Sequence, residues 1–568
     1  MSKIRPERAY SKKIFDGFDG LSSVTPPSEG GLHAISNFRI REDGVLEKRC
    51  GYRTYAIFSE PVRGFWQGTV GGSSRCFAVS GHTVYLLHNG TQTGCSDIFT
   101  AEGAVCFFTY SDRLFLSDGY RIYVFDEQRM IFSETDGYAP LYGRNWHPTE
   151  YGETYEELNL LSPKLRVHYL NTVGSYEFHL PYYAASIDKV RVDNRTVTDY
   201  FLNAARDILT LPSVGASVEI AFTMATETSE LDRIRTCTRA FTDRIEDRER
   251  LILYGSPDGK SLFCAAPVDW MMQGSCRVFY PQATPLYFTA NGHVSVGTPE
   301  SPVTALYQNH DRVLAFHGMG AASITFDPES DRVSLYPLLR GIGCCVNGVD
   351  LSSDGDPIVL NERGIVQLSS TISEPDVFTL KELSSGLKEV RELCKNPNTV
   401  VFHDTEHGEL WLRDPSDEKG TVWVMRLSGK QWYCFDAINA TFFCTIDGAP
   451  AYADEFGDLF VFDDDLLTDA GTPITATVET DFLSLSYPEL PKRSLRVSLC
   501  ATQRGSTRLT LETETRSKSY TFPEKESTSP TLIDLRASLG RFRFVRVRIS
   551  DNGQHRSKYH RLALYANL

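Results

Sequence analysis

The sequence predicts an all-β protein: a β-propeller with an inserted β-sandwich, followed by a C-terminal β-sandwich. Three observations support this fold class. Apolar runs are short, rich in Val, Ile, Phe and Tyr, and end at Asn, Asp, Gly or Pro, as strands and turns do. Similar units recur about every 45 to 60 residues, which is typical of propeller blades. The composition, with 12% aromatic residues, 42 Gly and 27 Pro, fits a chain rich in turns.

The clearest repeat unit lies between Ser301 and Ser373. Its apolar runs are only a few residues long and are separated by polar turns at 309–312 and 361–364. Such runs are too short and too often interrupted for helices. Units of the same kind return at 408–432 and 449–463. The repetition therefore predicts consecutive four-stranded blades.

The order of these patterns divides the chain into five parts. After Gly137 the blade pattern gives way to strands of clean alternation, and the charged stretch 227–250 leads back to it. Strands with one apolar face need a second sheet to cover them, which predicts sandwiches. We expect an N-terminal arm at 1–36, a first propeller segment at 37–137, an inserted β-sandwich domain at 138–232, a second propeller segment at 233–470 and a C-terminal β-sandwich domain at 471–568.

Charge and composition exclude several classes of protein. The net charge of −15 argues against a nucleic-acid clamp, because such proteins need Lys and Arg to displace counterions from phosphates. No stretch approaches the roughly 18 apolar residues of a transmembrane helix, and no apolar segment follows the basic first residues, so we expect no secretory signal. The 13 cysteines lack any CxxC spacing and lie mostly in apolar runs. We therefore expect buried, reduced thiols and assembly in a cytoplasm.

No catalytic or metal-binding motif is present in the sequence. The nucleophile elbow, the P-loop, the dinucleotide fingerprint and the zinc-protease motif are all missing. His403 and His407 are four residues apart, but they lie in a turn between strands, where this spacing does not place them on one face. The acidic turns lack the spacing of a calcium loop. We expect no catalytic centre, no cofactor and no metal.

One segment near the N-terminus points to a family. Residues 37–52 form a predicted β-hairpin whose turn ends at a glycine. The segment resembles the opening of tail nozzle and tail tubular proteins of short-tailed bacteriophages, although Cys50 replaces their usual proline. The propeller pattern at 250–330 is similar to the propellers of the same proteins. The residues that match the family's opening segment, called the motif residues below, are Asn37, Asp43, Gly44, Leu46, Lys48, Arg49 and Gly51.

The resemblance implies a structural virion component of a bacteriophage tail. Identical copies, with six expected, would form a ring-shaped conduit for genome ejection, assembled in the host cytoplasm. The implied partners are further copies of the chain, tail adaptor or portal-proximal proteins and tail fibres or spikes, with DNA in transit and no membrane span. The alternative is a propeller-based glycan-binding or glycan-cleaving tail protein, because carboxylates that converge in a propeller channel can cleave glycosidic bonds.

A conduit for DNA makes a further electrostatic prediction. A wall of Lys and Arg would hold DNA through counterion release, whereas a wall of Asp and Glu would keep it moving. Screening over about 8 to 10 Å confines the effect to the wall itself. The alternative interpretation is that acidic turns merely keep the surface soluble. The candidate lining residues are Asp350, Asp354, Asp356, Asp414, Asp417, Glu418, Asp463, Asp464 and Asp465.

Overall fold

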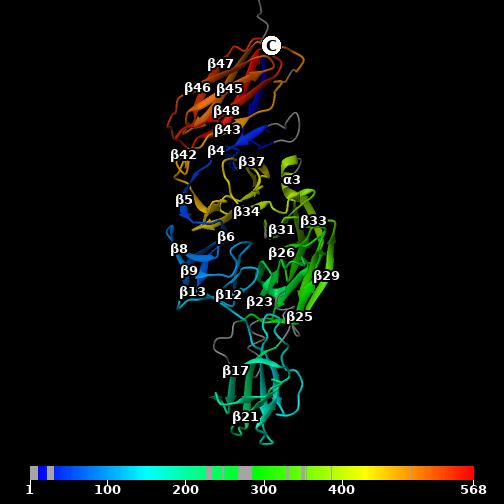
Figure 1. Cartoon of the computed structure of the whole chain (residues 1–568). Coiled ribbons are helices and arrows are strands. Elements are labelled where there is room, and N and C mark those ends of the chain that lie inside the picture. The colour runs from blue at the N-terminus through cyan, green and yellow to red at the C-terminus, as the bar shows by residue number, and fades with distance from the viewer. Residues whose placement is uncertain are drawn as a thin grey trace, which may run out of the picture.

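The chain is an all-β protein, as predicted. Figure 1 shows three parts in a row: the C-terminal sandwich at one end, the propeller in the middle and the inserted sandwich at the other end. None of the helices within the described ranges is long and apolar enough to cross a membrane. The computed structural model describes residues 10–21, 31–225, 233–245, 248–266, 285–327, 332–346, 352–353, 355–371, 373–384, 387–486 and 488–567.

The middle part is a β-propeller. Within the described ranges, strand pairing defines seven four-stranded antiparallel units, called blades 1 to 7 in order around the ring. Blades 1 and 2 precede the inserted sandwich. Blade 1 consists of β6 (Val62–Val70), β7 (Ser73–Ser80), β8 (Thr83–His88) and β9 (Thr91–Asp97). Blade 2 consists of β10 (Cys106–Tyr110), β11 (Arg113–Ser117), β12 (Ile122–Asp126) and β13 (Ile131–Glu134).

Blades 3 to 6 follow the insertion. Blade 3 consists of β22 (Arg239–Ile245), β23 (Arg248–Tyr254), β24 (Ser261–Ala265) and β25 (Phe288–Ser295). Blade 4 consists of β26 (Val303–Asn309), β27 (Arg312–His317), β28 (Gly320–Phe326) and β29 (Val333–Arg340). Blade 5 consists of β30 (Ser352–Ser353), β31 (Asp356–Asn361), β32 (Gly364–Thr371) and β33 (Glu374–Glu382). Blade 6 consists of β34 (Val400–Asp404), β35 (Glu409–Arg413), β36 (Val422–Arg426) and β37 (Gln431–Phe435).

Blade 7 closes the ring with a strand from the N-terminal part of the chain. Its first three strands are β38 (Phe442–Ile446), β39 (Ala449–Ala453) and β40 (Asp458–Asp463), and its fourth is β5 (Gly51–Ile57). β5 runs antiparallel to β40, with Tyr52 opposite Phe462. The Tyr52 ring lies edge-on to Phe460 and Phe462, at 5.2 and 5.6 Å between centroids. The closed ring therefore depends on pairing between segments far apart in the sequence.

Apolar clusters fill the spaces between neighbouring blades. Between blades 1 and 2, the Phe77 ring lies 5.0 Å from Phe125 and 5.3 Å from Phe132. Between blades 5 and 6, the helix α3 (Lys388–Lys395) adds Val390 to the cluster. Because each blade is covered on both faces, its inner strands are buried on both sides, which explains continuous apolar runs in place of alternation.

The inserted sandwich has its own core. Alternate residues of β15, such as Leu165, Val167 and Tyr169, face the space between two sheets. Part of the predicted insertion nevertheless belongs to the propeller: Leu161 packs between blades 2 and 3, and Asn159 Nδ2 donates to the Leu286 carbonyl at 3.0 Å. One sheet consists of β14 (Leu141–Trp146), β15 (Lys164–Leu170), β21 (Ser217–Met224), β17 (Ala184–Val192) and β18 (Arg195–Val197), and the other of β16 (Glu177–His179), β20 (Ile208–Thr210) and β19 (Phe201–Leu202).

The C-terminal sandwich is built from both ends of the chain. Its first sheet contains β1 (Tyr10–Phe15), β3 (Phe38–Ile40), β4 (Leu46–Lys48), β49 (Lys558–Asn567), β44 (Ser494–Thr502) and β47 (Thr531–Ala537). Its second sheet contains β2 (Ala34–Ser36), β43 (Ala476–Glu479), β48 (Val545–Asp551), β45 (Thr507–Thr513) and β46 (Ser517–Phe522). Through the pairing of β2 with β37, this second sheet is continuous with blade 6. The short strands β41 (Thr468–Asp469) and β42 (Thr472–Pro473) extend blade 7.

This arrangement differs from the predicted division at the N-terminus. The described parts of 1–36 are not an arm, because β1 pairs with β49 and β2 lies between β37 and β43. The predicted hairpin forms as β3 and β4, but β4 pairs with β49, so residues 37–48 lie in the sandwich and the propeller begins at β5. Residues 1–9 and 22–30 lie outside the described ranges. The local pattern identifies strands but not their partners, which tertiary contacts select.

The described cysteines are all free thiols, and Cys276 lies outside the described ranges. Burial raises the pKa of Cys50 and of Cys106 to about 11, so both thiols stay protonated at neutral pH. These side chains behave as small apolar groups.

Candidate functional site at the propeller–sandwich junction

The motif residues lie where the C-terminal sandwich meets blades 6 and 7. The chain passes from β3 and β4 in the sandwich directly into β5 in blade 7. Several of these residues are charged or polar and yet fully buried. Buried polar groups are stable only when their hydrogen bonds are made, so each one requires a specific partner.

Arg49 is the centre of the junction, with 1% of its surface exposed. Its Nη1 and Nη2 donate to the two carboxylate oxygens of Asp469 at 2.8 and 2.5 Å. Nε donates to Asn37 Oδ1 at 2.8 Å, Nη1 also to the Cys50 carbonyl at 3.0 Å, and Nη2 also to the Asp436 carbonyl at 3.2 Å. All five N–H groups of the guanidinium are thus used. Arg49 joins the end of blade 6, the extension of blade 7 and the sandwich.

Burial raises the pKa of the Asp469 carboxyl, although the hydrogen bonds from Arg49 oppose this change. The guanidinium therefore offsets part of the cost of burying this carboxylate. A planar fork that binds a carboxylate through two parallel hydrogen bonds also fixes orientation, which a lysine would not do.

Asn37 connects the same groups from the other side. Its Nδ2 donates to the Thr475 carbonyl at 2.8 Å and to Asp436 Oδ1, and its Oδ1 accepts from the Asp436 amide at 3.1 Å. The backbone of Asn37 has φ of +59°, a region in which Asn is among the favoured residues. The residue therefore serves both the backbone turn and the buried network.

Lys48 is fully buried on the sandwich side of the junction. Its Nζ donates to the Gly553 carbonyl at 2.7 Å and lies 3.5 Å from Asp551 Oδ1. Asp551 Oδ2 also accepts from Ser557 Oγ and Tyr559 Oη, both at 2.7 Å. Burial lowers the pKa of Lys48, and Asp551 limits this decrease. This lysine anchors the hairpin to β48 and β49.

The remaining motif residues shape the backbone. Asp43 Oδ1 accepts from the Val45 amide at 3.2 Å within the hairpin turn, and Gly44 has φ of +74°. Leu46 is fully buried. At Gly51, a Cβ would lie 2.0 Å from the Thr468 carbonyl oxygen, so only glycine fits between β5 and β41. The contacts of the motif residues therefore give each of them an architectural role.

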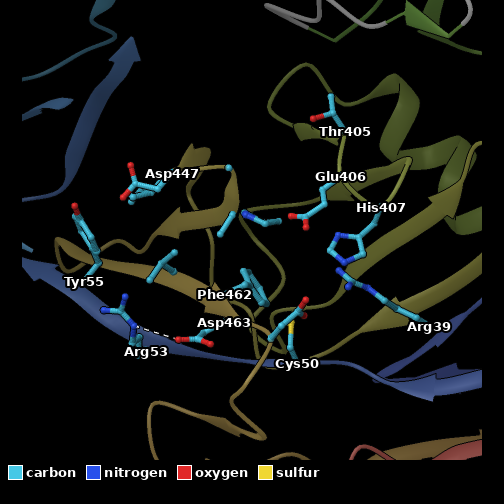
Figure 2. Close-up of a pocket in the computed structure, with 16 residues that line it drawn as sticks. Arg39, Cys50, Arg53, Tyr55, Thr405, Glu406, His407, Asp447, Phe462 and Asp463 are labelled. Atoms are coloured by element: carbon cyan, nitrogen blue, oxygen red, sulfur yellow. Dashed lines mark ion pairs between the residues drawn. The ribbon is translucent and has the colours of Figure 1, made fainter. Parts of the chain in front are cut away.

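A charged crevice, called the junction crevice below, opens beside this network. It consists of two cavities of about 670 and 710 Å³ that share Arg39, His407 and Asp464. In Figure 2, His407 and Arg39 lie together on one side and Asp447 and Tyr55 on the other, with the Arg53–Asp463 ion pair below.

Arg39 forms the inner wall of the crevice, with 7% of its surface exposed. Its Nε lies 3.1 Å from Glu409 Oε1 and its Nη2 3.7 Å from Asp404 Oδ2, whereas Nη1 has no partner among the described residues. His407 Nδ1 lies 2.7 Å from Asp404 Oδ2. Burial alone would raise the pKa of Asp404, but His407 and Arg39 lower it below its ordinary value. Among the described residues, one guanidinium N–H group of Arg39 is thus buried without a hydrogen-bond partner.

The structure does not bring the candidate lumen residues together on one chain. Neighbouring strands of a blade run in opposite directions. Asp356 at the start of β31 and Asp463 at the end of β40 therefore lie on one face of the propeller. Asp414 after β35 lies on the opposite face, and Asp417 and Glu418 belong to the same turn. Asp464 pairs with Arg556 at 3.1 Å, and Asp465 follows it in the same acidic turn. Asp350 and Asp354 lie outside the described ranges. The acidic conduit stays a prediction about an assembly of copies.

Over the described part of the chain, no group of three His, Cys, Asp or Glu side chains could hold a metal ion. Sequence reasoning missed Asp469 and Asp551, whose carboxylates pair with Arg49 and Lys48, and Asp436, whose carboxylate accepts from Asn37. The adjacent basic pair Lys48 and Arg49, within the short predicted hairpin, was the signal that buried acidic partners exist.

Comparisons with known proteins give only distant likenesses. No family model matches the chain. No curated protein matches it either. The WD40 domain of Neurospora crassa Pan2 is 7% identical, with a TM-score of 0.26 over 73% of this chain and 95% of that one. A family 43 arabinoxylan arabinofuranohydrolase from Bacillus subtilis, in complex with cellotetraose, is 10% identical, with a TM-score of 0.18 over 67% and 95% of the two chains.

The extracellular domain of the one-component system BT4673 from B. thetaiotaomicron is 7% identical, with a TM-score of 0.24 over 91% of this chain and 62% of that one. At such TM-scores these likenesses carry no argument about function. The assignment as a β-propeller protein rests on the pairing of its own strands.

Proposed function

We propose that this chain is a structural component of a bacteriophage tail, a nozzle or tail tube protein whose copies form a ring-shaped conduit for genome ejection. One observation carries the proposal. The residues through which the sequence resembles that family lie in one short segment, in which Asn37 and Arg49 join the sandwich to blades 6 and 7 and Lys48 fixes the hairpin within the sandwich. A motif that only stabilises the contact between two domains suits a structural subunit of an assembly. The motif of an enzyme would instead place a reacting group in a cavity.

The shape of the chain also supports the proposal. Sandwiches at opposite ends of a propeller offer separate surfaces for neighbouring copies and for other tail proteins (Figure 1). The sheet that continues from blade 6 into the sandwich fixes the angle between the two parts. Such a rigid subunit can repeat around an axis with one defined geometry.

The test is the mass and shape of the purified full chain. Light scattering should give several copies per particle, with six expected, and negative-stain electron microscopy should show closed rings. Arg496→Met, which removes an exposed ion pair with Asp534, is a surface control that should assemble normally. A chain that remains monomeric at high concentration, or forms compact trimers, would contradict the proposal.

A second candidate, binding of an acidic glycan, is supported by the junction crevice, which Arg39 and His407 line beside several carboxylates. A sugar carboxylate could accept from the Arg39 guanidinium, and the carboxylates of Glu406, Asp447 and Asp463 could accept from sugar hydroxyls. Calorimetry with an oligogalacturonate tests this candidate. Binding that is lost in Arg39→Met and kept in Arg496→Met would support it, and absence of binding would remove it.

A further inference from the structure

The far end of the inserted sandwich forms an apolar tip. β15 begins near the propeller, where Lys164 Nζ lies 2.5 Å from Asp136, and runs outward to Leu170. β21 runs antiparallel to β15, so its start at Ser217 lies at the same outer end. Figure 1 places this sandwich at the opposite end of the molecule from the C-terminal sandwich. The two loops at this end, residues 170–176 and 211–217, are called the tip below.

The tip has an unusual composition. Neither loop contains a charged residue, although 23% of the chain is charged. It exposes apolar side chains instead, with relative exposures of 60% for Val173, 52% for Tyr176, 45% for Val214 and 42% for Leu170. Tyrosine combines an apolar ring with a polar end, which suits a boundary between water and an apolar phase. The tip is thus an exposed apolar surface without charge.

Part of the backbone of the tip is already hydrogen-bonded. Asn171 is buried, and its Nδ2 donates to the carbonyls of Ser175 and Gly215 at 2.8 and 3.0 Å, while its Oδ1 accepts from the Ser175 amide at 2.8 Å. The Asn171 amide donates to the Ala216 carbonyl at 3.0 Å. Moving polar backbone groups into an apolar phase costs several kcal/mol unless they are hydrogen-bonded. Asn171 removes much of this cost and ties the two loops together.

The size of the tip favours a lipid surface over a protein partner. Stable protein interfaces bury about 800 Å² on each side, which is more than the four exposed apolar side chains of two short loops supply. A fluid bilayer needs no matching groove.

The charge of the chain selects the kind of lipid. The turn beside the tip carries Asp193 and Arg195, whose charges cancel, and the whole chain has a net charge of −15. Anionic headgroups would repel such a protein, and zwitterionic headgroups would not. We propose that the tip inserts Val173, Tyr176 and Val214 into the interface of a zwitterionic lipid surface, independently of the tail function.

The experiment is flotation of the full chain with phosphatidylcholine vesicles. The wild-type chain should float with them, and the bound fraction should not fall between low and physiological salt, because no ion pair is involved. Phosphatidylglycerol vesicles should bind less at low salt. The double variant Val173→Asp and Val214→Asp should lower the partition coefficient about tenfold or more, since it replaces apolar area by charge. The matched control is Leu532→Asp, 64% exposed on the C-terminal sandwich, which should bind as wild type does.

A gain of binding separates the proposal from a folding defect. Val173→Trp should raise the partition coefficient, because tryptophan favours the membrane interface. Circular dichroism should give equal unfolding temperatures for all variants. Absence of flotation by the wild-type chain, equal flotation of the double variant, or a double variant that loses self-association with no change in vesicle binding would each overturn the proposal. The last result would assign the tip to contact between copies.

Discussion

Replacing Arg49 by Met tests the junction most directly. The substitution keeps much of the side-chain volume but removes all five hydrogen-bond donors, so that Asp469 is left buried with a charge and no partner. Breaking a buried ion pair by removing one partner costs about 3 to 5 kcal/mol. We expect a loss of this size in the free energy of unfolding, measured by urea titration at neutral pH.

The pH dependence gives a second readout for the same variant. Burial already raises the pKa of Asp469, and without Arg49 that pKa rises further. A carboxyl whose folded pKa lies above its unfolded value binds more protons in the folded state, so stability falls as the pH rises between these two values. The Arg49→Met variant should therefore lose less stability at pH 5 than at pH 8.

Two comparisons make the experiment decisive. The double variant Arg49→Met and Asp469→Asn removes the stranded charge and should recover part of the loss. Arg496→Met breaks an Arg–Asp pair of similar geometry that is exposed to water, with both contacts at 2.8 Å, and should change the free energy much less. A loss below about 1 kcal/mol in Arg49→Met, or a double variant as unstable as the single one, would refute the reasoning about a buried ionic junction.

Three further predictions address closure, acid stability and packing. Gly51→Ala should yield little folded protein, because its Cβ would lie 2.0 Å from the Thr468 carbonyl oxygen; soluble expression close to wild type would show that β5 and β41 can separate at no great cost. His407 holds the folded pKa of Asp404 below its ordinary value, so the pair stabilises the fold above about pH 4 and this stabilisation is lost as the pH falls further. Acid unfolding of Asp404→Asn should therefore be less steep than that of the wild type. An acid unfolding profile that is unchanged in this variant would contradict the role of the pair. Phe77→Ala should cost about 3 to 5 kcal/mol, because the ring fills the space between blades 1 and 2; calorimetry that gives less than 1 kcal/mol would mean that these blades repack.

The sequence predicts the local structure of this chain well and its long-range pairing poorly. Runs such as β27 and β35 are recognisable because burial on both faces demands continuous apolar residues, and turns such as that at Gly44 because φ is positive. Nothing in residues 10–15 indicates that β1 would pair with β49, since a strand's own side chains do not encode its neighbour.

The residues of the candidate site could likewise be predicted only in part from the sequence. The motif residues could be selected by their resemblance to a family, but their partners Asp436, Asp469 and Asp551 are ordinary acidic residues of turns and strands until the fold closes. The junction crevice could not be predicted either, because Arg39 and His407 come from separate parts of the chain. A sequence can indicate that a buried charge needs an opposite charge nearby, but it does not identify the residue that supplies that charge.

The contribution of β5 to blade 7 has a consequence for synthesis on the ribosome. Its partner β40 is made only after all the other blades and the insertion, roughly 400 residues later, which at 5 to 20 residues per second takes about 20 to 80 seconds. During this time β5 has a free edge, and so do β3 and β4, which await β49. Neighbouring nascent chains carry the same free edges, so two chains can exchange strands before either ring is closed. Slow translation at low temperature lengthens this exposure, and we expect the yield of correctly closed monomer to depend on how well chaperones cover β3, β4 and β5.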